Sequence, residues 1–85
     1  MKKLIILPTY NESKNIRKTI EIINNQGSDA DILIVDDNSP DGTAALVKDL
    51  DLKNIFIIER ESKQGLGSAY VNGFKWALDN SYSKI

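Results

Sequence analysis

The chain has 85 residues, which is enough for one small domain. Its formal net charge is −1, so it lacks the basic character of nucleic-acid-binding proteins, and no nucleic-acid partner is expected. Cysteine and histidine are both absent, which excludes disulfides, thiolate or imidazole metal sites and histidine general bases.

The first predicted element is a short strand over Leu4–Leu7, which is apolar on both faces, as in sheets that helices cover on both sides. Pro8 is expected to end it. The apolar run is too short for the core of a signal peptide, and no stretch approaches the ~20 apolar residues of a membrane span. We therefore expect a soluble, cytoplasmic chain.

The first predicted helix covers about Glu12–Asn25. Asn11 is its expected N-cap, and Gly27 occupies the usual stop position. Three isoleucines at i, i+4 and i+7 define its buried face. These are Ile16, Ile20 and Ile23.

Two further strands are predicted at Ile32–Val35 and Ile55–Ile58, both apolar throughout. A second helix lies between them and is expected to open at Ser39-Pro40, with serine as the cap and proline at the first helical position. A charged loop is predicted over Glu59–Gln64. The buried stripe of the second helix is expected to comprise Leu46, Val47 and Leu50.

The third predicted helix, from about Gly65 to Asn80, has the clearest helical period in the chain. Trp76 falls off its apolar stripe, residues 81–84 indicate a turn, and Ile85 looks like the first residue of a fourth strand. Three strand–helix units predict a Rossmann-like α/β fold, with a parallel sheet and helices on both faces. The stripe of the third helix comprises Leu66, Ala69, Tyr70, Gly73, Phe74, Ala77 and Leu78.

The loop after the first strand, Pro8–Glu12, is a candidate ligand site because ligands bind at the carboxyl edge of open α/β sheets. It contains no glycine, which disfavours both a dinucleotide fingerprint and the glycine-rich loop of sugar nucleotidyltransferases. Tyr10 offers a ring that could stack on a base, and Glu12 offers a hydrogen-bond acceptor. The alternative is structural: Tyr10 packs under the loop, and Glu12 is simply favoured at a helix N-terminus.

The second strand delivers two carboxylates, Asp36 and Asp37, to the same edge. Such a pair can bind a metal or accept hydrogen bonds from a base or ribose. A response-regulator receiver is disfavoured because it needs an acidic pair after its first strand and an aspartate after its third. Gly65-x-Gly67, with Lys63 beside it, indicates either a phosphate contact or a helix opening that packs closely.

Three motifs together resemble the amino-terminal part of the family 2 glycosyltransferases with the GT-A fold. They are Leu7–Glu12 (LPTYNE), Val35–Thr43 (VDDNSPDGT) and Lys63–Tyr70 (KQGLGSAY). The resemblance covers essentially the whole chain with its spacing, and it is strongest to the dolichol-phosphate (polyprenol-phosphate) mannosyltransferase branch.

This resemblance implies a nucleotide-sugar site in which Asp37 faces the base and ribose while Asp36 is structural. It implies GDP-mannose as donor, dolichyl or another polyprenyl phosphate as acceptor at the cytoplasmic face of a membrane, and Mg or Mn as cofactor of an inverting transfer. The residues that it implies for the donor nucleotide are Pro8, Tyr10, Glu12, Val35 and Asp37, with Lys63 near the pocket.

The family holds its metal with an Asp-x-Asp motif after a fourth strand, and we expect those ligands beyond Ile85. The Asp-x-Asp sequences that are present, at 29–31 and 49–51, precede strands and lie on the opposite edge. We therefore interpret residues 1–85 as the nucleotide-sugar-binding portion of a longer enzyme, not catalytic by itself. The alternatives are a family 2 enzyme that uses a UDP-sugar and a non-enzymatic interaction module. An uncovered Leu4–Leu7 edge also predicts self-association.

Overall fold

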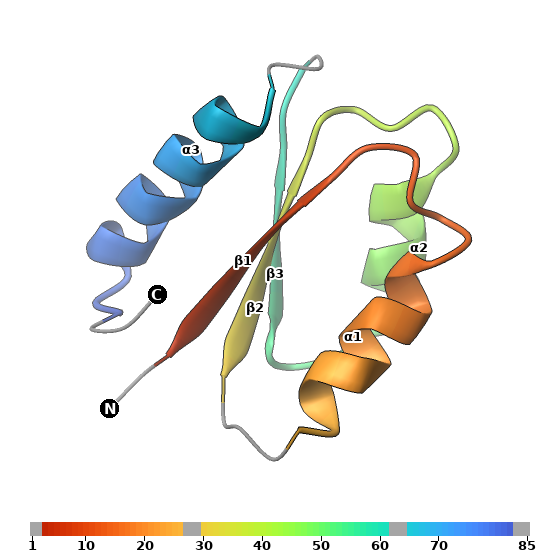
Figure 1. Cartoon of the computed structure of the whole chain (residues 1–85), viewed down its shortest axis with the longest axis horizontal. Helices are drawn as coiled ribbons and strands as arrows, with labels where there is room; N and C mark the ends of the chain where they lie inside the picture. Colours follow the sequence, from red (N-terminus) through yellow and green to blue (C-terminus); the bar gives the residue numbers. More distant parts are fainter. Residues whose placement is uncertain (1–2, 27–29, 62–64, 83–85) are drawn as a thin grey trace.

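The computed structural model describes residues 3–26, 30–61 and 65–82. Three parallel strands form one sheet in the order β1-β2-β3. Helix α3 covers one face of this sheet, and α1 and α2 cover the other (Figure 1). The predicted α/β fold with three strand–helix units is confirmed. The elements are β1 (Leu4–Thr9), α1 (Ile16–Asn24), β2 (Asp31–Asp36), α2 (Thr43–Asp49), β3 (Ile55–Glu59) and α3 (Leu66–Asp79).

Strand β2 is the centre of the core, and its residues 32–35 are fully buried. Leu33 and Val35 pack toward α3, whereas Ile32 and Ile34 pack toward α1 and α2. Successive side chains of a strand point to opposite faces. A central strand with helices on both sides must therefore be apolar at every position, which explains the continuous run that predicted it.

Two boundaries around the first loop differ from the prediction. Strand β1 does not stop at Pro8: it continues to Thr9, with Pro8 opposite Val35. Proline is tolerated there because β1 has a sheet partner on one side only among the described residues. Helix α1 begins at Ile16, so Asn11 is not its N-cap. Asn11 instead adopts a left-handed conformation (φ 55°) within the loop, and the predicted stop at Gly27 lies outside the described residues.

Helix α2 begins at Thr43, later than the predicted opening at Ser39-Pro40. Gly42 occupies the N-cap position with φ 82°, a left-handed conformation that favours glycine. The side chain of Ser39 binds Asp36 instead of capping the helix. The predicted stripe is confirmed, since Val47 is buried and Leu46 and Leu50 pack beside it.

Helix α3 has nearly its predicted bounds, but only part of its predicted stripe is buried. Tyr70 and Phe74, predicted in the stripe, are 43% and 47% exposed. Small residues face the sheet instead, and a Cβ on Gly73 would lie 2.7 Å from Ile6 Cδ1. This close approach leaves no room for bulky side chains between α3 and β1. Trp76 packs against the core, with ring centroids 5.2 Å from Phe56 and 5.6 Å from Tyr82. The buried residues of α3 are Ala69, Gly73 and Ala77.

Tyr82 anchors the segment after α3 to the amino end of β2. Its side chain is buried, and its hydroxyl donates a hydrogen bond to Asp31 Oδ2 at 2.6 Å. Burial, followed by the hydrogen bond to Asp31 and the charge of that residue, raises the pKa of Tyr82 to about 12. Ile85 lies outside the described residues. None of the helices in the described ranges is long and apolar enough to cross a membrane.

Candidate functional site

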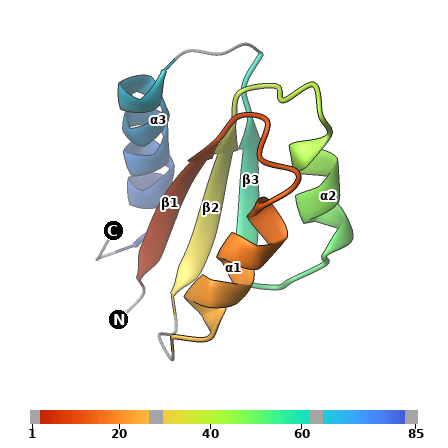
Figure 2. The same ribbon diagram turned by 45° about the vertical axis from the view of Figure 1, so that its right-hand side comes forward.

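A hollow of about 290 Å³ lies at the carboxyl ends of β1 and β2, beside the start of α3. The loops that follow the strands all lie at this end of the sheet (Figure 2). It is the edge at which open α/β sheets bind ligands. The hollow is lined by Pro8, Thr9, Tyr10, Glu12, Asp37, Gly65, Leu66 and Ala69.

The structure thus brings together four of the six residues predicted to bind a nucleotide sugar: Pro8, Tyr10, Glu12 and Asp37. Val35 does not line the hollow, because its side chain is fully buried in the core below it. Lys63 lies outside the described residues. The contacts of all six predicted residues with a nucleotide stay predictions.

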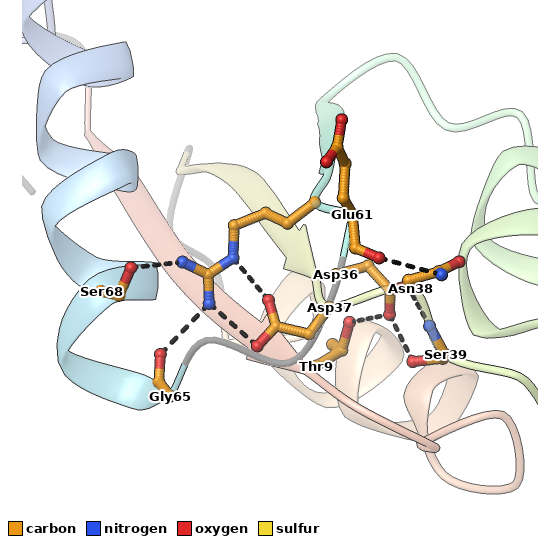
Figure 3. A network of polar contacts seen from close by, with 9 residues as sticks. Thr9, Asp36, Asp37, Asn38, Ser39, Glu61, Gly65 and Ser68 are labelled. Atoms are coloured by element: carbon orange, nitrogen blue, oxygen red, sulfur yellow. Dashed lines mark hydrogen bonds and ion pairs between the residues drawn. The ribbon is translucent and has the colours of Figure 1, made fainter.

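The two adjacent aspartates, Asp36 and Asp37, have different hydrogen-bond partners. Asp36 is 1% exposed and accepts hydrogen bonds from the Thr9 hydroxyl at 2.6 Å and from the Ser39 hydroxyl at 2.7 Å. It also accepts one from the Ser39 backbone N–H at 2.9 Å. Figure 3 shows this carboxylate surrounded by its partners from two strand ends. Asp36 therefore ties the end of β1 to the loop after β2, which agrees with a structural role.

Asp37 forms a buried ion pair with Arg60, and their side chains are only 9% and 3% exposed. The Arg60 guanidinium donates Nε–H to Asp37 Oδ1 and Nη2–H to Oδ2, the latter at 2.9 Å. Such a two-pronged pair orients a carboxylate as well as compensating its charge. Arg60 also donates to the Ser68 hydroxyl at 2.8 Å and to the Gly65 carbonyl at 3.2 Å. It thereby connects Asp37 to the first turn of α3 (Figure 3).

The sequence did not single out Arg60, because the residue falls in the predicted charged loop Glu59–Gln64. A usable signal was present: Arg60 directly follows β3, so it reaches the same edge as the Asp37 carboxylate. A cation and a carboxylate that follow neighbouring parallel strands are placed to meet.

The start of α3 faces the hollow through Gly65, Leu66 and Ala69. Gly65 has φ 90°, a backbone conformation that side chains rarely adopt, which explains glycine at this position. A Cβ on Gly67 would meet nothing within 4 Å, so close packing does not explain the second glycine. A helix N-terminus at a hollow offers backbone N–H groups and a positive dipole end to a phosphate.

A divalent cation does not fit the described residues. They contain no cluster of three or more potential metal-ligating side chains. The carboxylates that line the hollow are those of Glu12 and Asp37, and Asp37 is engaged with a guanidinium. The neighbouring Asp36 carboxylate does not line the hollow and is engaged with hydroxyl and amide donors. We assign no metal ligand within residues 3–26, 30–61 and 65–82.

The sequence profile described as "Glycosyl transferase family 2" matches residues 4–82. The chain is 42% identical over 85 residues to the polyprenol monophosphomannose synthase of Mycolicibacterium smegmatis, covering 96% of this chain and 32% of that protein. It is 38% identical over 87 residues to the undecaprenyl-phosphate mannosyltransferase of Micrococcus luteus, covering 100% of this chain and 36% of that one. The dolichol-phosphate mannosyltransferase of Pyrococcus furiosus is 41% identical over 80 residues, with coverage of 91% and 23%.

The chain therefore spans about a third or less of the length of the curated relatives that it matches. Among solved structures, the fold resembles a mannosyltransferase from Pyrobaculum calidifontis in complex with GDP-Man and Mn2+. The TM-score is 0.82 at 24% identity, over 89% of this chain and 24% of that one. This likeness confirms the Rossmann-like fold that the sequence predicted.

Proposed function

The chain belongs to glycosyl transferase family 2, and we propose that it is the donor-binding portion of an enzyme that transfers mannose from GDP-mannose to a polyprenyl phosphate. The observation that carries this proposal is the hollow at the carboxyl edge, where Tyr10, Glu12 and Asp37 converge beside the start of α3. The names of the relatives support mannose as the sugar and a polyprenyl phosphate, such as dolichyl phosphate, as the acceptor. The GDP-Man complex of the structural neighbour supports the donor.

Each wall of the hollow suits one part of a nucleotide sugar. Tyr10 and Glu12 line the hollow, and we assign the Tyr10 ring to stack on the base and the Glu12 carboxylate to accept hydrogen bonds. We assign Asp37, which Arg60 orients, to accept hydrogen bonds from donors of the base or ribose. The N-terminus of α3 at Gly65 faces the position proposed for the diphosphate. Pro8, Val35 and Lys63 complete the proposed nucleotide-binding set.

The transfer that we propose is inverting: the acceptor phosphate attacks the anomeric carbon, and GDP departs with the bonding electrons. A divalent cation, Mg or Mn, would stabilise the charge on the departing diphosphate. The described residues supply no ligand set for that cation, so we propose that residues 1–85 bind the donor without performing the transfer. We place the enzyme at the cytoplasmic face of a membrane, where a lipid acceptor is accessible.

NMR titration of the ¹⁵N-labelled chain with GDP, UDP and ADP tests the proposal. We expect GDP to bind with a dissociation constant of about 1 mM or weaker, because only part of the diphosphate's ligands are present. The amide signals of Tyr10, Val35 and Asp37 should move. Tyr10→Ala should weaken binding, whereas Tyr70→Ala removes an exposed ring that does not line the hollow and should not.

The same titration separates the alternatives. A preference for UDP would indicate a family 2 enzyme with a UDP-sugar donor. Shifts that cluster away from the hollow would contradict the site. The absence of any response to nucleotides would favour a non-enzymatic interaction module.

A further inference from the structure

The loop between β1 and α1 is held by side chains of the loop between β2 and α2 and of the first residue of α2. Three successive backbone N–H groups of the first loop donate hydrogen bonds to three side-chain oxygens of this second segment. Backbone groups in a loop need such partners when no helix or sheet supplies them. The bonds run from Asn11 to Ser39 Oγ at 2.9 Å, from Glu12 to Thr43 Oγ1 at 3.0 Å and from Ser13 to Asp41 Oδ2 at 3.0 Å.

The three accepting oxygens are themselves fixed. The Ser39 hydroxyl donates to the buried carboxylate of Asp36 at 2.7 Å, so its lone pairs point toward the first loop. Thr43 is fully buried, and its hydroxyl donates to Asp41 Oδ1. The Thr43 hydroxyl is also the largest of the influences that lower the pKa of Asp41 to about 2. Asp41 therefore accepts hydrogen bonds as a carboxylate across the whole physiological pH range.

These bonds flank the two side chains that matter most in the first loop. Tyr10 and Glu12 line the hollow. The N–H groups that donate the three hydrogen bonds, which we call the clamp, belong to Glu12 itself and to its neighbours on either side, Asn11 and Ser13. Asn11 has φ 55°, a conformation that few non-glycine residues adopt, so the loop path depends on external partners. The Glu12 carbonyl accepts hydrogen bonds from the N–H groups of Asn15 and Ile16, so the start of α1 holds that carbonyl. The N–H groups of residues 11–13 are held instead by Ser39, Thr43 and Asp41.

We propose that Ser39, Asp41 and Thr43 are positioning residues for nucleotide recognition. They do not line the hollow; they hold the backbone of residues 11–13 so that the Tyr10 ring and the Glu12 carboxylate face the ligand. This role accounts for the polar side chains of the Ser-Pro-Asp-Gly-Thr segment, which neither helix capping nor metal binding explains. The inference rests on the proposed function for the identity of the ligand, whereas the clamp itself can be measured without any ligand.

The sharpest variant is Thr43→Val, which keeps the shape of the buried side chain and removes its hydroxyl. Thr43→Ser is the matched control, because it keeps the hydroxyl. In the valine variant we expect hydrogen exchange of the Glu12 amide to accelerate about 3- to 10-fold, the ratio corresponding to one lost hydrogen bond. GDP binding by the same chain should weaken by a similar factor. Thr43→Ser should stay within about twofold of the wild type in both measurements.

Two further variants test the remaining hydrogen bonds, and a third variant is a control at a distant position. Ser39→Ala should accelerate exchange at Asn11, and Asp41→Asn should do so at Ser13 or Thr43, since an amide replaces one of the two accepting oxygens. Asp49→Asn alters an exposed carboxylate at the far end of α2 and should change neither exchange nor affinity.

Several results would overturn the inference. Unchanged hydrogen exchange at residues 11–13 in Thr43→Val, Ser39→Ala and Asp41→Asn would show that these side chains do not hold the loop. Accelerated exchange with unchanged GDP affinity, or equal loss of affinity in Thr43→Val and Thr43→Ser, would show that the clamp does not position the site. If the wild-type chain binds no nucleotide, the proposed function fails, and local exchange alone decides: acceleration supports the clamp and no change refutes it.

Discussion

Removal of the Arg60 side chain should destabilise the fold far more than removal of an exposed cation. Arg60→Met leaves the Asp37 carboxylate, 9% exposed, without its guanidinium partner. Breaking a buried pair from one side typically costs about 3–5 kcal/mol, because the remaining charge stays desolvated. Small domains are stable by only about 5–15 kcal/mol, so the variant should lose a large fraction of its free energy of unfolding.

Urea denaturation followed by circular dichroism measures this loss. With a denaturant slope of about 1 kcal/mol/M, the midpoint should fall by about 3 M or more, or the chain should be unfolded without urea. The control is Lys48→Met, which breaks the Lys48–Glu59 pair, where the side chains are 55% and 52% exposed. An exposed pair is worth about 0–1 kcal/mol.

A double variant, Asp37→Leu with Arg60→Met, distinguishes an unpaired charge from lost packing. It removes both charges and should recover most of the stability that Arg60→Met loses. The reasoning is refuted if Arg60→Met costs no more than Lys48→Met, or if the double variant is no more stable than Arg60→Met alone.

Three further predictions concern packing, pH and assembly. Gly73→Ala should destabilise the chain by up to about 2 kcal/mol in thermal unfolding, since a Cβ 2.7 Å from Ile6 outweighs the gain in helix propensity; in an Ile6→Ala background the same change should be stabilising. The pKa of Tyr82 is raised to about 12 in the fold against about 10 when unfolded, so stability should be complete below pH 10 and fall as pH rises toward 12. Tyr82→Phe should lack this alkaline loss, and an identical loss in the variant would assign it to other groups. Sedimentation equilibrium should show a mass that increases with concentration, because β1 has a strand on one side only within the described residues; a concentration-independent monomer would contradict this.

Periodicity predicted the elements well where burial is two-sided or the stripe is wide. Residues 32–35 could be identified as a buried strand because a strand covered on both faces is apolar at every position. The bounds of α3 were also predictable. Which members of its predicted stripe touch the sheet was not, because Gly73 allows an approach so close that the small residues, not Phe74, form the contact.

The predictions that failed at the carboxyl edge share one cause. Local rules assigned Asn11 and Ser39 to the caps of their own helices, but each takes part in a bond between two loops that are distant in sequence. Arg60 was assigned only to a charged loop for the same reason, since its partner Asp37 is 23 residues away. Motif spacing placed Tyr10, Glu12 and Asp37 together correctly; the contacts that hold them required three dimensions.

Pro8 has a geometric consequence for the free side of β1. The Lys3 carbonyl accepts a hydrogen bond from Asp31 N–H, and the Thr9 carbonyl accepts one from Asp37 N–H directly after β2. The backbone groups of odd-numbered residues therefore point inward, and those of Leu4, Ile6 and Pro8 point outward. A strand that paired with the outer side could use the N–H groups of Leu4 and Ile6 but would find no donor at Pro8. Such a strand would form one hydrogen bond fewer at Pro8, one residue before the end of β1 and two before Tyr10.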